Sequence, residues 1–179
     1  RQLAFDDSSW SEGQSAFSTT AYSDTAEATL WNQLPPVPLS RSFYLRRKFT
    51  VTDPQAVKWL VLRQDYTHGF VAYLNGSEVA RAGVGTSGTD TPYNTAAASH
   101  EGNAEETFSL PKSYLVAGTN VIAVQAFNQS LASSDFEIDL DLVDPEGIDL
   151  TPPRAAAIAP TPGTVVRALV RIDVTFSEE

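Results

Sequence analysis

The sequence predicts an all-β protein that folds as an antiparallel β-sandwich. The dipeptide Asn75-Gly76 lies between two apolar-rich runs, and these residue types tolerate the positive φ angles that a tight hairpin turn requires. Residues 121–127 form an almost wholly apolar run, with the length and β-branched content of a central buried strand. Residues 135–143 alternate between apolar and acidic side chains with a period of two, which is typical of a half-buried strand.

The earlier strands show the same period. Residues 43–51 place apolar side chains on one face, apart from Arg47, and polar side chains on the other. After a turn at 52–55, further strands are predicted at 57–62, 70–74 and 78–81. Trp59 and Phe70 fall within these strands and are predicted to be core residues, because aromatic side chains at such positions are usually buried. A single helical turn is predicted at 111–115, before Gly118.

The acidic face of the strand at 135–143 indicates which strand lies beside it. Its four carboxylates repel one another unless cations lie across the sheet. Arg46 and Lys48 occupy the polar face of the strand at 43–51. We therefore predict that these two strands are neighbours in one sheet.

Composition limits the partners of the protein. Twenty-two acidic residues against twelve basic ones give a net charge of −10, which argues against nucleic acid because phosphate binding needs clustered Lys and Arg. No apolar stretch approaches the roughly 18 residues of a membrane span. The chain has no cysteine, so neither a disulfide nor a thiolate metal site is available. Methionine is also absent, even at position 1, and we expect a processed chain or an excised fragment.

A family resemblance is carried by three segments: the hairpin at 69–81, the turn and strand at 117–128, and an opening segment in which Asp7, Trp10 and Gly13 fit the pattern D.SW..G. They resemble the galactose-binding-like jelly roll of many carbohydrate-binding modules and of the sugar-binding domain of β-galactosidases. The resemblance implies such a sandwich at 1–145, a glycan ligand, and an extracellular location, secreted or at the cell surface. It also implies that Trp10 packs under the sandwich edge.

The composition changes after residue 145. Residues 146–156 are rich in proline and predict a stiff linker. Residues 157–163, Ala-Ile-Ala-Pro-Thr-Pro-Gly, and the alternating run at 170–176 resemble the opening of a bacterial immunoglobulin-like repeat. Residues 157–179 are therefore predicted to be the truncated beginning of such a domain. Because two strands cannot bury a sandwich core, we expect one module of a longer polypeptide with neighbouring domains.

Sugar recognition needs aromatic faces for stacking and polar side chains that hydrogen-bond the hydroxyls. The predicted ligand-binding residues are Trp31, Tyr66, His68, Arg81, Tyr93 and Asn128. Tyr66 and His68 stand where relatives show an Asp-Asp-Gly turn, and the alternative for them is a surface turn with exposed rings. Arg81 ends the hairpin and Asn128 ends the central strand, so each either points into a binding cleft or is a satisfied edge residue. The long polar segments 11–32 and 82–106 are candidate binding loops.

The resemblance also implies a structural calcium ion near one end of the sandwich. The predicted ligands are Asp6, Asp7 and Asp135, since the opening segment and the final strand lie side by side in related jelly rolls. Carboxylate and carbonyl oxygens in loops supply the six to eight ligands that calcium takes. The alternative is that these acids are simply solvated, as surface acids usually are on a protein of this charge.

Catalytic motifs are absent from the sequence. His68 and His100 have no zinc-ligand spacing, and there is no nucleophile elbow or phosphate-binding glycine loop. Ser99-His100-Glu101 can be drawn as part of a triad, but adjacent side chains point apart, and a surface histidine in a loop is the simpler interpretation. Paired carboxylates for glycoside hydrolysis cannot be identified from the sequence alone.

Three functions are consistent with these observations. The first hypothesis is a non-catalytic carbohydrate-binding module that targets a larger secreted or cell-surface protein to a polysaccharide or other glycan. The alternative is a structural or adhesive spacer domain of an extracellular protein, without a sugar site. A small hydrolase is the third hypothesis.

Overall fold

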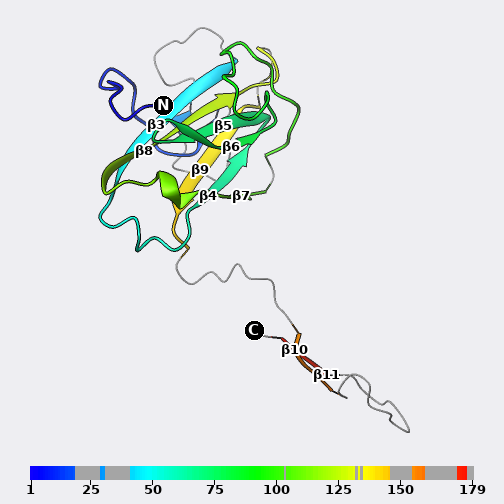
Figure 1. Cartoon of the computed structure of the whole chain (residues 1–179). Coiled ribbons are helices and arrows are strands. Elements are labelled where there is room, and N and C mark those ends of the chain that lie inside the picture. Colours follow the sequence, from blue (N-terminus) through cyan, green and yellow to red (C-terminus); the bar gives the residue numbers. More distant parts are fainter. Residues whose placement is uncertain are drawn as a thin grey trace. The chain divides into compact units, whose positions relative to one another are not determined.

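The computed structural model describes residues 1–18, 29–30, 41–102, 104–131, 133 and 135–145, and the backbone of two further strands at 155–159 and 173–176. The chain divides into two compact units, Arg1–Glu146 and Gly147–Glu179 (Figure 1). Among the described residues, no helix has the length and apolar character needed to cross a membrane.

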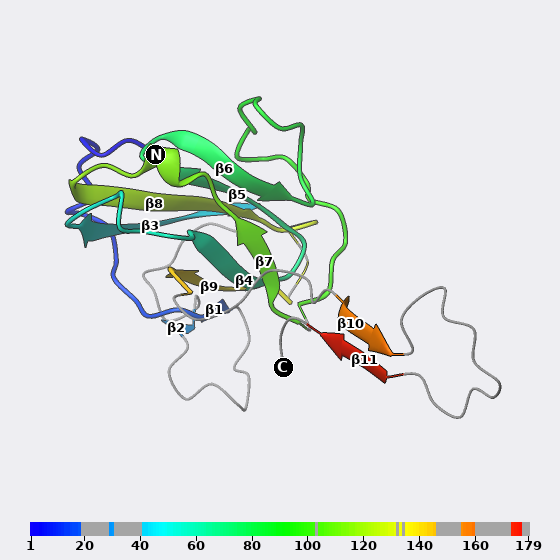
Figure 2. The ribbon, with the colours of Figure 1, turned by 60° about the horizontal axis from the view of Figure 1, so that its bottom comes forward.

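The first unit is a β-sandwich of two sheets, which Figure 2 shows as separate layers. Sheet A has the order β2-β1-β9-β4-β7 and sheet B the order β3-β8-β5-β6. The strands of sheet A are β1 (Phe17–Ser18), β2 (Thr29–Leu30), β4 (Val61–Tyr66), β7 (Glu106–Ser109) and β9 (Glu137–Val143). Those of sheet B are β3 (Ser42–Val51), β5 (Gly69–Leu74), β6 (Ser77–Ala82) and β8 (Gly118–Phe127). All described pairings in this unit are antiparallel except the short β1–β2 pair, so the predicted fold class is confirmed.

The main core lies between the two sheets. Phe70 of β5 is fully buried, and its ring lies 4.9 Å from that of Tyr66 and 5.2 Å from that of Phe108, measured between centroids. Phe43 of β3 meets Phe136, just before β9, at 4.4 Å. Burial of such rings is the main force that holds the two layers together.

The predicted hairpin turn is confirmed. Asn75 and Gly76 connect β5 and β6 with φ angles of 51° and 92°, as a two-residue hairpin turn requires. The Asn75 side chain also accepts a hydrogen bond from the backbone N–H of Val121 and donates to the carbonyl oxygen of Tyr114. The predicted helical turn at 111–115 is a 3-10 turn, η2 (Lys112–Tyr114).

One predicted strand begins later than the sequence indicated. We predicted a strand at 57–62 with Trp59 in the core, but β4 begins at Val61 and Trp59 is 48% exposed. The Asp144 carboxylate accepts hydrogen bonds from the backbone N–H groups of Lys58 and Trp59. The Asp144 side chain therefore accepts backbone hydrogen bonds that a neighbouring strand would otherwise accept.

The predicted pairing of the acidic strand with the strand at 43–51 is wrong. β9 belongs to sheet A and β3 to sheet B. Arg46 and Lys48 instead form ion pairs with Asp7 of the opening segment. Across sheet A, Arg63 of β4 lies opposite Asp141. Burial, with Asp65 and Asp139 nearby, raises the pKa of Glu137, which is the effect expected of crowded carboxylates.

The long segment after β6 covers part of the outer face of sheet B. Val84 and Ala97 are buried there in a second apolar cluster with Val71 and Phe127 of the sheet. The backbone of this segment is tied down by hydrogen bonds from Ala98 N–H to the carbonyl oxygen of Gly83 and from Ala97 N–H to that of Asn128. Strand β7, which the sequence did not predict, follows at the end of this segment.

The described part of the second unit contains an antiparallel strand pair, β10 (Ala155–Ala159) and β11 (Asp173–Phe176). The register pairs Ile158 with Val174 and shifts between Ala155 and Ala157. The immunoglobulin-like character of this unit stays a prediction.

Candidate functional site

The outer face of sheet B contains a small hollow above β8. Its position follows from the register, which places Arg46 of β3 and Tyr73 of β5 on either side of Ala123. Tyr44 lies opposite Gln125, two residues further along β8. Because the methyl group of Ala123 is much smaller than its neighbours, a space of about 30 Å³ remains over it. We call this space the hollow.

Two half-exposed aromatic rings line the hollow. Tyr44 is 49% exposed, and its hydroxyl accepts a hydrogen bond of 3.1 Å from Nε2 of Gln125. The same amide nitrogen lies 3.4 Å from the carbonyl oxygen of Thr91, in the long loop. Trp10 is 39% exposed and packs edge-on against Phe5, with centroids 5.6 Å apart. Exposed aromatic faces beside a polar amide are suited to contact with a sugar ring.

The opening segment is held against the hollow by charged side chains. The Arg46 guanidinium is paired with Asp7 and donates to the carbonyl oxygens of Gln2 and Leu3. Lys48 reaches the other carboxylate oxygen of Asp7 at 2.8 Å. The Arg1 guanidinium lies 4.4 Å from the centroid of the Tyr73 ring, within the range of a cation–π contact.

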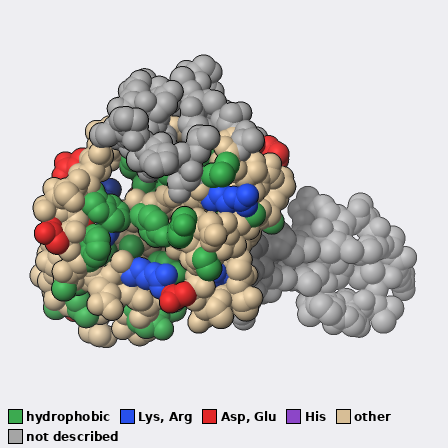
Figure 3. Space-filling model, turned by 90° about the horizontal axis from the view of Figure 1, so that it is seen from above, with side chains coloured by type: hydrophobic (Ala, Val, Ile, Leu, Met, Phe, Trp, Pro, Cys, Tyr) green, Lys and Arg blue, Asp and Glu red, His purple; other side chains and the backbone are tan. Residues whose placement is uncertain are grey.

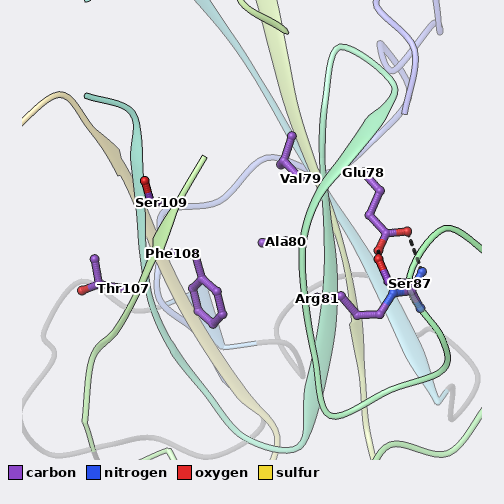
Figure 4. A pocket seen from close by; sticks show the side chains of 8 residues that line it. All are labelled: Glu78, Val79, Ala80, Arg81, Ser87, Thr107, Phe108 and Ser109. Atoms are coloured by element: carbon purple, nitrogen blue, oxygen red, sulfur yellow. Dashed lines mark hydrogen bonds and ion pairs between the residues drawn. The ribbon is translucent and has the colours of Figure 1, made fainter. Parts of the chain in front are cut away.

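A larger groove, of about 510 Å³, lies between β6 and β7, the edge strands of the two sheets. Figure 4 shows Val79, Ala80 and Phe108 among its lining side chains, with Glu78, Arg81 and Ser87 grouped to one side. Phe108 is only partly buried and also contacts the core. The groove thus opens between the edge strands of the two sheets.

Arg81, a predicted ligand-binding residue, uses all five of its N–H groups within the protein. Two of them bind the carboxylate of Glu78, at 2.9 and 2.8 Å. The others donate to the carbonyl oxygens of Val84 and Thr89 and to the hydroxyl of Thr91. This arrangement, which we call the Arg81 clasp, fixes the loop that follows β6 and leaves no N–H group for a ligand.

The clasp predicts a specific pH dependence. The hydrogen bonds from Arg81, with smaller contributions from Gly88 and Ser87, lower the pKa of Glu78 to about 2. Its ordinary value is 4.5, so the ionised carboxylate stabilises the fold above that value, and the stabilisation is lost as the pH falls towards 2. We expect about 2 kcal/mol of stability, after allowance for solvent screening, to depend on this ionisation.

Urea denaturation between pH 7 and pH 2 measures this effect. Glu78→Gln should be less stable than the wild type at pH 7 and nearly equal to it at pH 2. Parallel stability curves for the two proteins over the whole range would show that Glu78 contributes nothing through its charge.

The sequence is compatible with a surface turn with exposed rings at 65–69, but the structure places Tyr66 and His68 in the interior. The Tyr66 ring stacks on that of His100, with centroids 4.3 Å apart. One oxygen of Glu106 accepts from the Tyr66 hydroxyl at 3.1 Å and the other lies 2.9 Å from Nε2 of His100. Burial, followed by Glu106, raises the pKa of Tyr66 to about 12. These contacts anchor the long loop to β4.

His68 is 1% exposed and has a φ of 73°. Its Nε2 lies 3.2 Å from the Asp135 carboxylate and 3.3 Å from the Ser133 hydroxyl. The hydrogen bond from Ser133, and next the one with His68, lower the pKa of Asp135. Asn128 is also buried, donates to the carbonyl oxygen of Ser133 and accepts from Ser130 N–H. His68 and Asn128 thus act as internal tethers.

The three predicted calcium ligands are not brought together. Asp7 is engaged by Arg46 and Lys48, and Asp135 by Ser133 and His68. Asp6 is exposed to solvent, and its carboxylate accepts a hydrogen bond from Ser8 N–H, which lowers the pKa of Asp6. Within the part of the chain that the structure describes, no three His, Asp or Glu residues form a group that fits a metal ion. These residues therefore do not fit the predicted calcium site.

Of the predicted ligand-binding residues, Tyr93 is open to solvent, with 66% of its surface exposed, and it lies two residues from Thr91. Trp31 lies outside the described residues. Trp10 was expected to pack under the sandwich edge and is half-exposed instead. Tyr44 was not among the predicted ligand residues, although an aromatic ring on the polar face of the strand at 43–51 is a signal for it.

One face of the molecule carries both hydrophobic and charged side chains (Figure 3). On the face drawn in Figure 3, exposed hydrophobic side chains gather near the middle, Lys and Arg side chains flank them, and most acidic side chains lie towards the rim. The exposed rings of the first unit include those of Phe5, Trp10, Tyr44 and Tyr93. Trp59 and Tyr114 are exposed as well, so exposure by itself does not identify a binding site.

Comparisons with known proteins give a distant similarity to part of a solved structure. No protein family profile matches the chain, and no curated protein matches it. Among solved structures, the chain is similar to part of a β-D-mannosidase from Dictyoglomus thermophilum, with 20% sequence identity and a TM-score of 0.34. The similarity covers 54% of this chain and 11% of that enzyme, so the chain spans about a tenth of the enzyme's length.

Proposed function

We propose that this chain is a non-catalytic carbohydrate-binding module of a larger secreted or cell-surface protein, and that it binds a polysaccharide or other glycan on the outer face of sheet B. One observation carries the proposal: the half-exposed rings of Tyr44 and Trp10 line one hollow together with the amide of Gln125. Pyranose rings stack on aromatic faces through their C–H surfaces, and an amide beside them hydrogen-bonds a hydroxyl. Binding by such a module raises the local concentration of its neighbouring domains at the polymer.

The geometry supports this face over the ligand-binding residues that the sequence predicts. Arg81, His68 and Asn128 already have partners within the protein. Tyr44 and Trp10 offer ring surface that the fold leaves exposed, and the rigid sheet beneath them limits the entropy lost on binding. Tyr93, in the loop whose Thr91 contacts Gln125, adds a third exposed ring near this face.

A spacer without a sugar site is the alternative function. The observation that favours it is the internal use of Arg81, His68 and Asn128, because a domain that only extends a larger protein needs buried tethers and no free polar groups. The two proposals differ in one measurable property, the retention of the protein by glycans.

Affinity gel electrophoresis with β-glucan, mannan, galactan and xylan tests the proposed function. We expect the wild type to be retarded by at least one of these polymers. Tyr44→Ala and Trp10→Ala should each weaken binding about tenfold, because each removes a stacking ring. Trp59→Ala is the matched control, since Trp59 is equally exposed but does not line the hollow.

Two outcomes would contradict the proposal. If no polymer of the panel retards the wild type, the spacer is the better description. If Trp59→Ala weakens binding as much as Tyr44→Ala, the glycan binds on another face. The melting temperature of each variant shows whether a loss of binding reflects a loss of fold.

A further inference from the structure

The hollow combines small size with polar atoms that lack a partner. Tyr73 is 4% exposed and Gln125 is 2% exposed, and the side chain of Arg46 is 1% exposed. The hydroxyl of Tyr73, Oε1 of Gln125 and Nε of Arg46 are buried, and no group in the described part of the chain hydrogen-bonds them. All three side chains line the hollow. Buried polar atoms are nearly always paired, so three unpaired ones around one space indicate a polar occupant.

The chemistry of the three atoms defines that occupant. Oε1 of Gln125 needs a donor, Nε of Arg46 needs an acceptor, and the Tyr73 hydroxyl serves as either. One hydroxyl group carries one donor and two acceptor lone pairs, so it complements all three. The volume of about 30 Å³ exceeds the roughly 10–15 Å³ that a cavity needs to hold one water molecule. The space therefore admits a hydroxyl group and is too small for a sugar ring.

We propose that the hollow receives the hydroxymethyl group of a hexose, so that this site selects glycans built of hexoses over those built of pentoses. This inference rests on the proposed glycan-binding function. A hydroxymethyl oxygen stands one carbon farther from the pyranose ring than a ring hydroxyl does. It reaches below the surface while the ring itself stays stacked on Tyr44. Pentopyranoses lack this group and leave the three polar atoms unpaired.

Entry of the hydroxymethyl group requires a shift of the side chains above the hollow. Arg1 and Trp10 line it from the opening segment, and both are partly exposed. Rotamer changes of exposed side chains take picoseconds to nanoseconds. The backbone beneath stays in place, because β8 is paired with β5, and side-chain shifts around the hollow open the way to the three buried atoms.

Isothermal titration with cellohexaose, mannohexaose and xylohexaose tests the selectivity. We expect at least one of the two hexose oligomers to bind about tenfold or more tightly than xylohexaose, which lacks hydroxymethyl groups. Equal or tighter binding of xylohexaose overturns this inference and leaves the proposed function standing. Absence of binding by all three, together with no retardation in the polymer panel, overturns the proposed function and the inference with it.

Tyr73→Phe separates recognition from folding. The change removes only a hydroxyl that has no partner in the described structure, so we expect the melting temperature to stay the same or rise. Affinity for the better hexose oligomer should fall about 3- to 10-fold, while affinity for xylohexaose stays unchanged. Tyr114→Phe, at an exposed ring that does not line the hollow, is the control and should change neither. Unchanged hexose affinity in Tyr73→Phe would show that the hollow holds an ordered water only, which overturns the inference.

Discussion

Gly83→Ala is expected to destabilise the protein by about 4 kcal/mol or more, close to the whole stability of many domains. Gly83 follows β6 with a φ of +65°, a conformation that L side chains rarely adopt. A Cβ atom at this position would lie 2.1 Å from the carbonyl oxygen of His68 and 3.1 Å from Cα of Gly69. Both are backbone atoms, one in the β4–β5 connection and one in the first residue of β5, so no side-chain movement relieves the overlap.

Gly88→Ala is the matched control for Gly83→Ala. Gly88 has a similar φ of +77°, but nothing lies within 4 Å of the position of its Cβ. This variant should lose about 1 kcal/mol, the cost of the backbone conformation alone. Urea denaturation measures both variants. Equal losses at the two positions would mean that the close approach of Gly83 to His68 has no energetic weight.

Arg81→Ala is the second large effect, with an expected loss of about 3 kcal/mol. The change leaves the Glu78 carboxylate without its main partner and removes the donors to Val84, Thr89 and Thr91. Arg81→Lys keeps the charge but loses the planar set of five donors, so it should recover only part of the stability. Chemical denaturation at pH 7 measures the free energies of unfolding of the wild type, Arg81→Ala and Arg81→Lys.

A double-mutant cycle identifies the source of the Arg81 effect. If the loss arises mainly from the unpaired Glu78 carboxylate, Arg81→Ala should cost much less in a Glu78→Gln background. Strictly additive losses would contradict the clasp. The same variants test the link to the glycan site, because Arg81 positions Thr91 and Thr91 contacts Gln125. Arg81→Lys should therefore weaken glycan binding when the fold is intact.

The proposed glycan site depends on residues that act through their neighbours. Gln125 fixes the Tyr44 hydroxyl, and the Arg81 clasp fixes the loop that lies over Gln125. In the proposed site Arg81 is thus a positioning residue, whereas the sequence allowed either a direct ligand or a satisfied edge residue. Side chains that are held in place before the ligand binds improve affinity, because less conformational freedom is lost on binding.

Local sequence patterns predicted several elements correctly. The alternation at 43–51 matches β3, the apolar run at 121–127 lies within β8, and Asn75-Gly76 forms the turn between β5 and β6. These features depend on side-chain period and on the φ preference of two residues. Both are properties of a few consecutive residues, so one sequence suffices to recognise them.

Other features depended on partners that are distant in the sequence. Trp59 is exposed because Asp144, 85 residues away, binds its backbone N–H. His68 is buried because Ser133, Asp135 and the loop at His100 close around its turn. No local pattern records such contacts, so the interpretation of 65–69 as a surface turn failed.

The sequence by itself determined that the chain forms alternating strands joined by defined turns, because strand period and turn chemistry are local. Only the tertiary structure decided which strands share a sheet. It places β3 and β9 in different layers, and Arg46 and Lys48 form ion pairs with Asp7. It also decided that Ala123 lies between Arg46 and Tyr73, which leaves the hollow. The physical reason is that register and sheet order are set by packing between distant segments, and any charged strand face has several possible cationic neighbours until the core selects one.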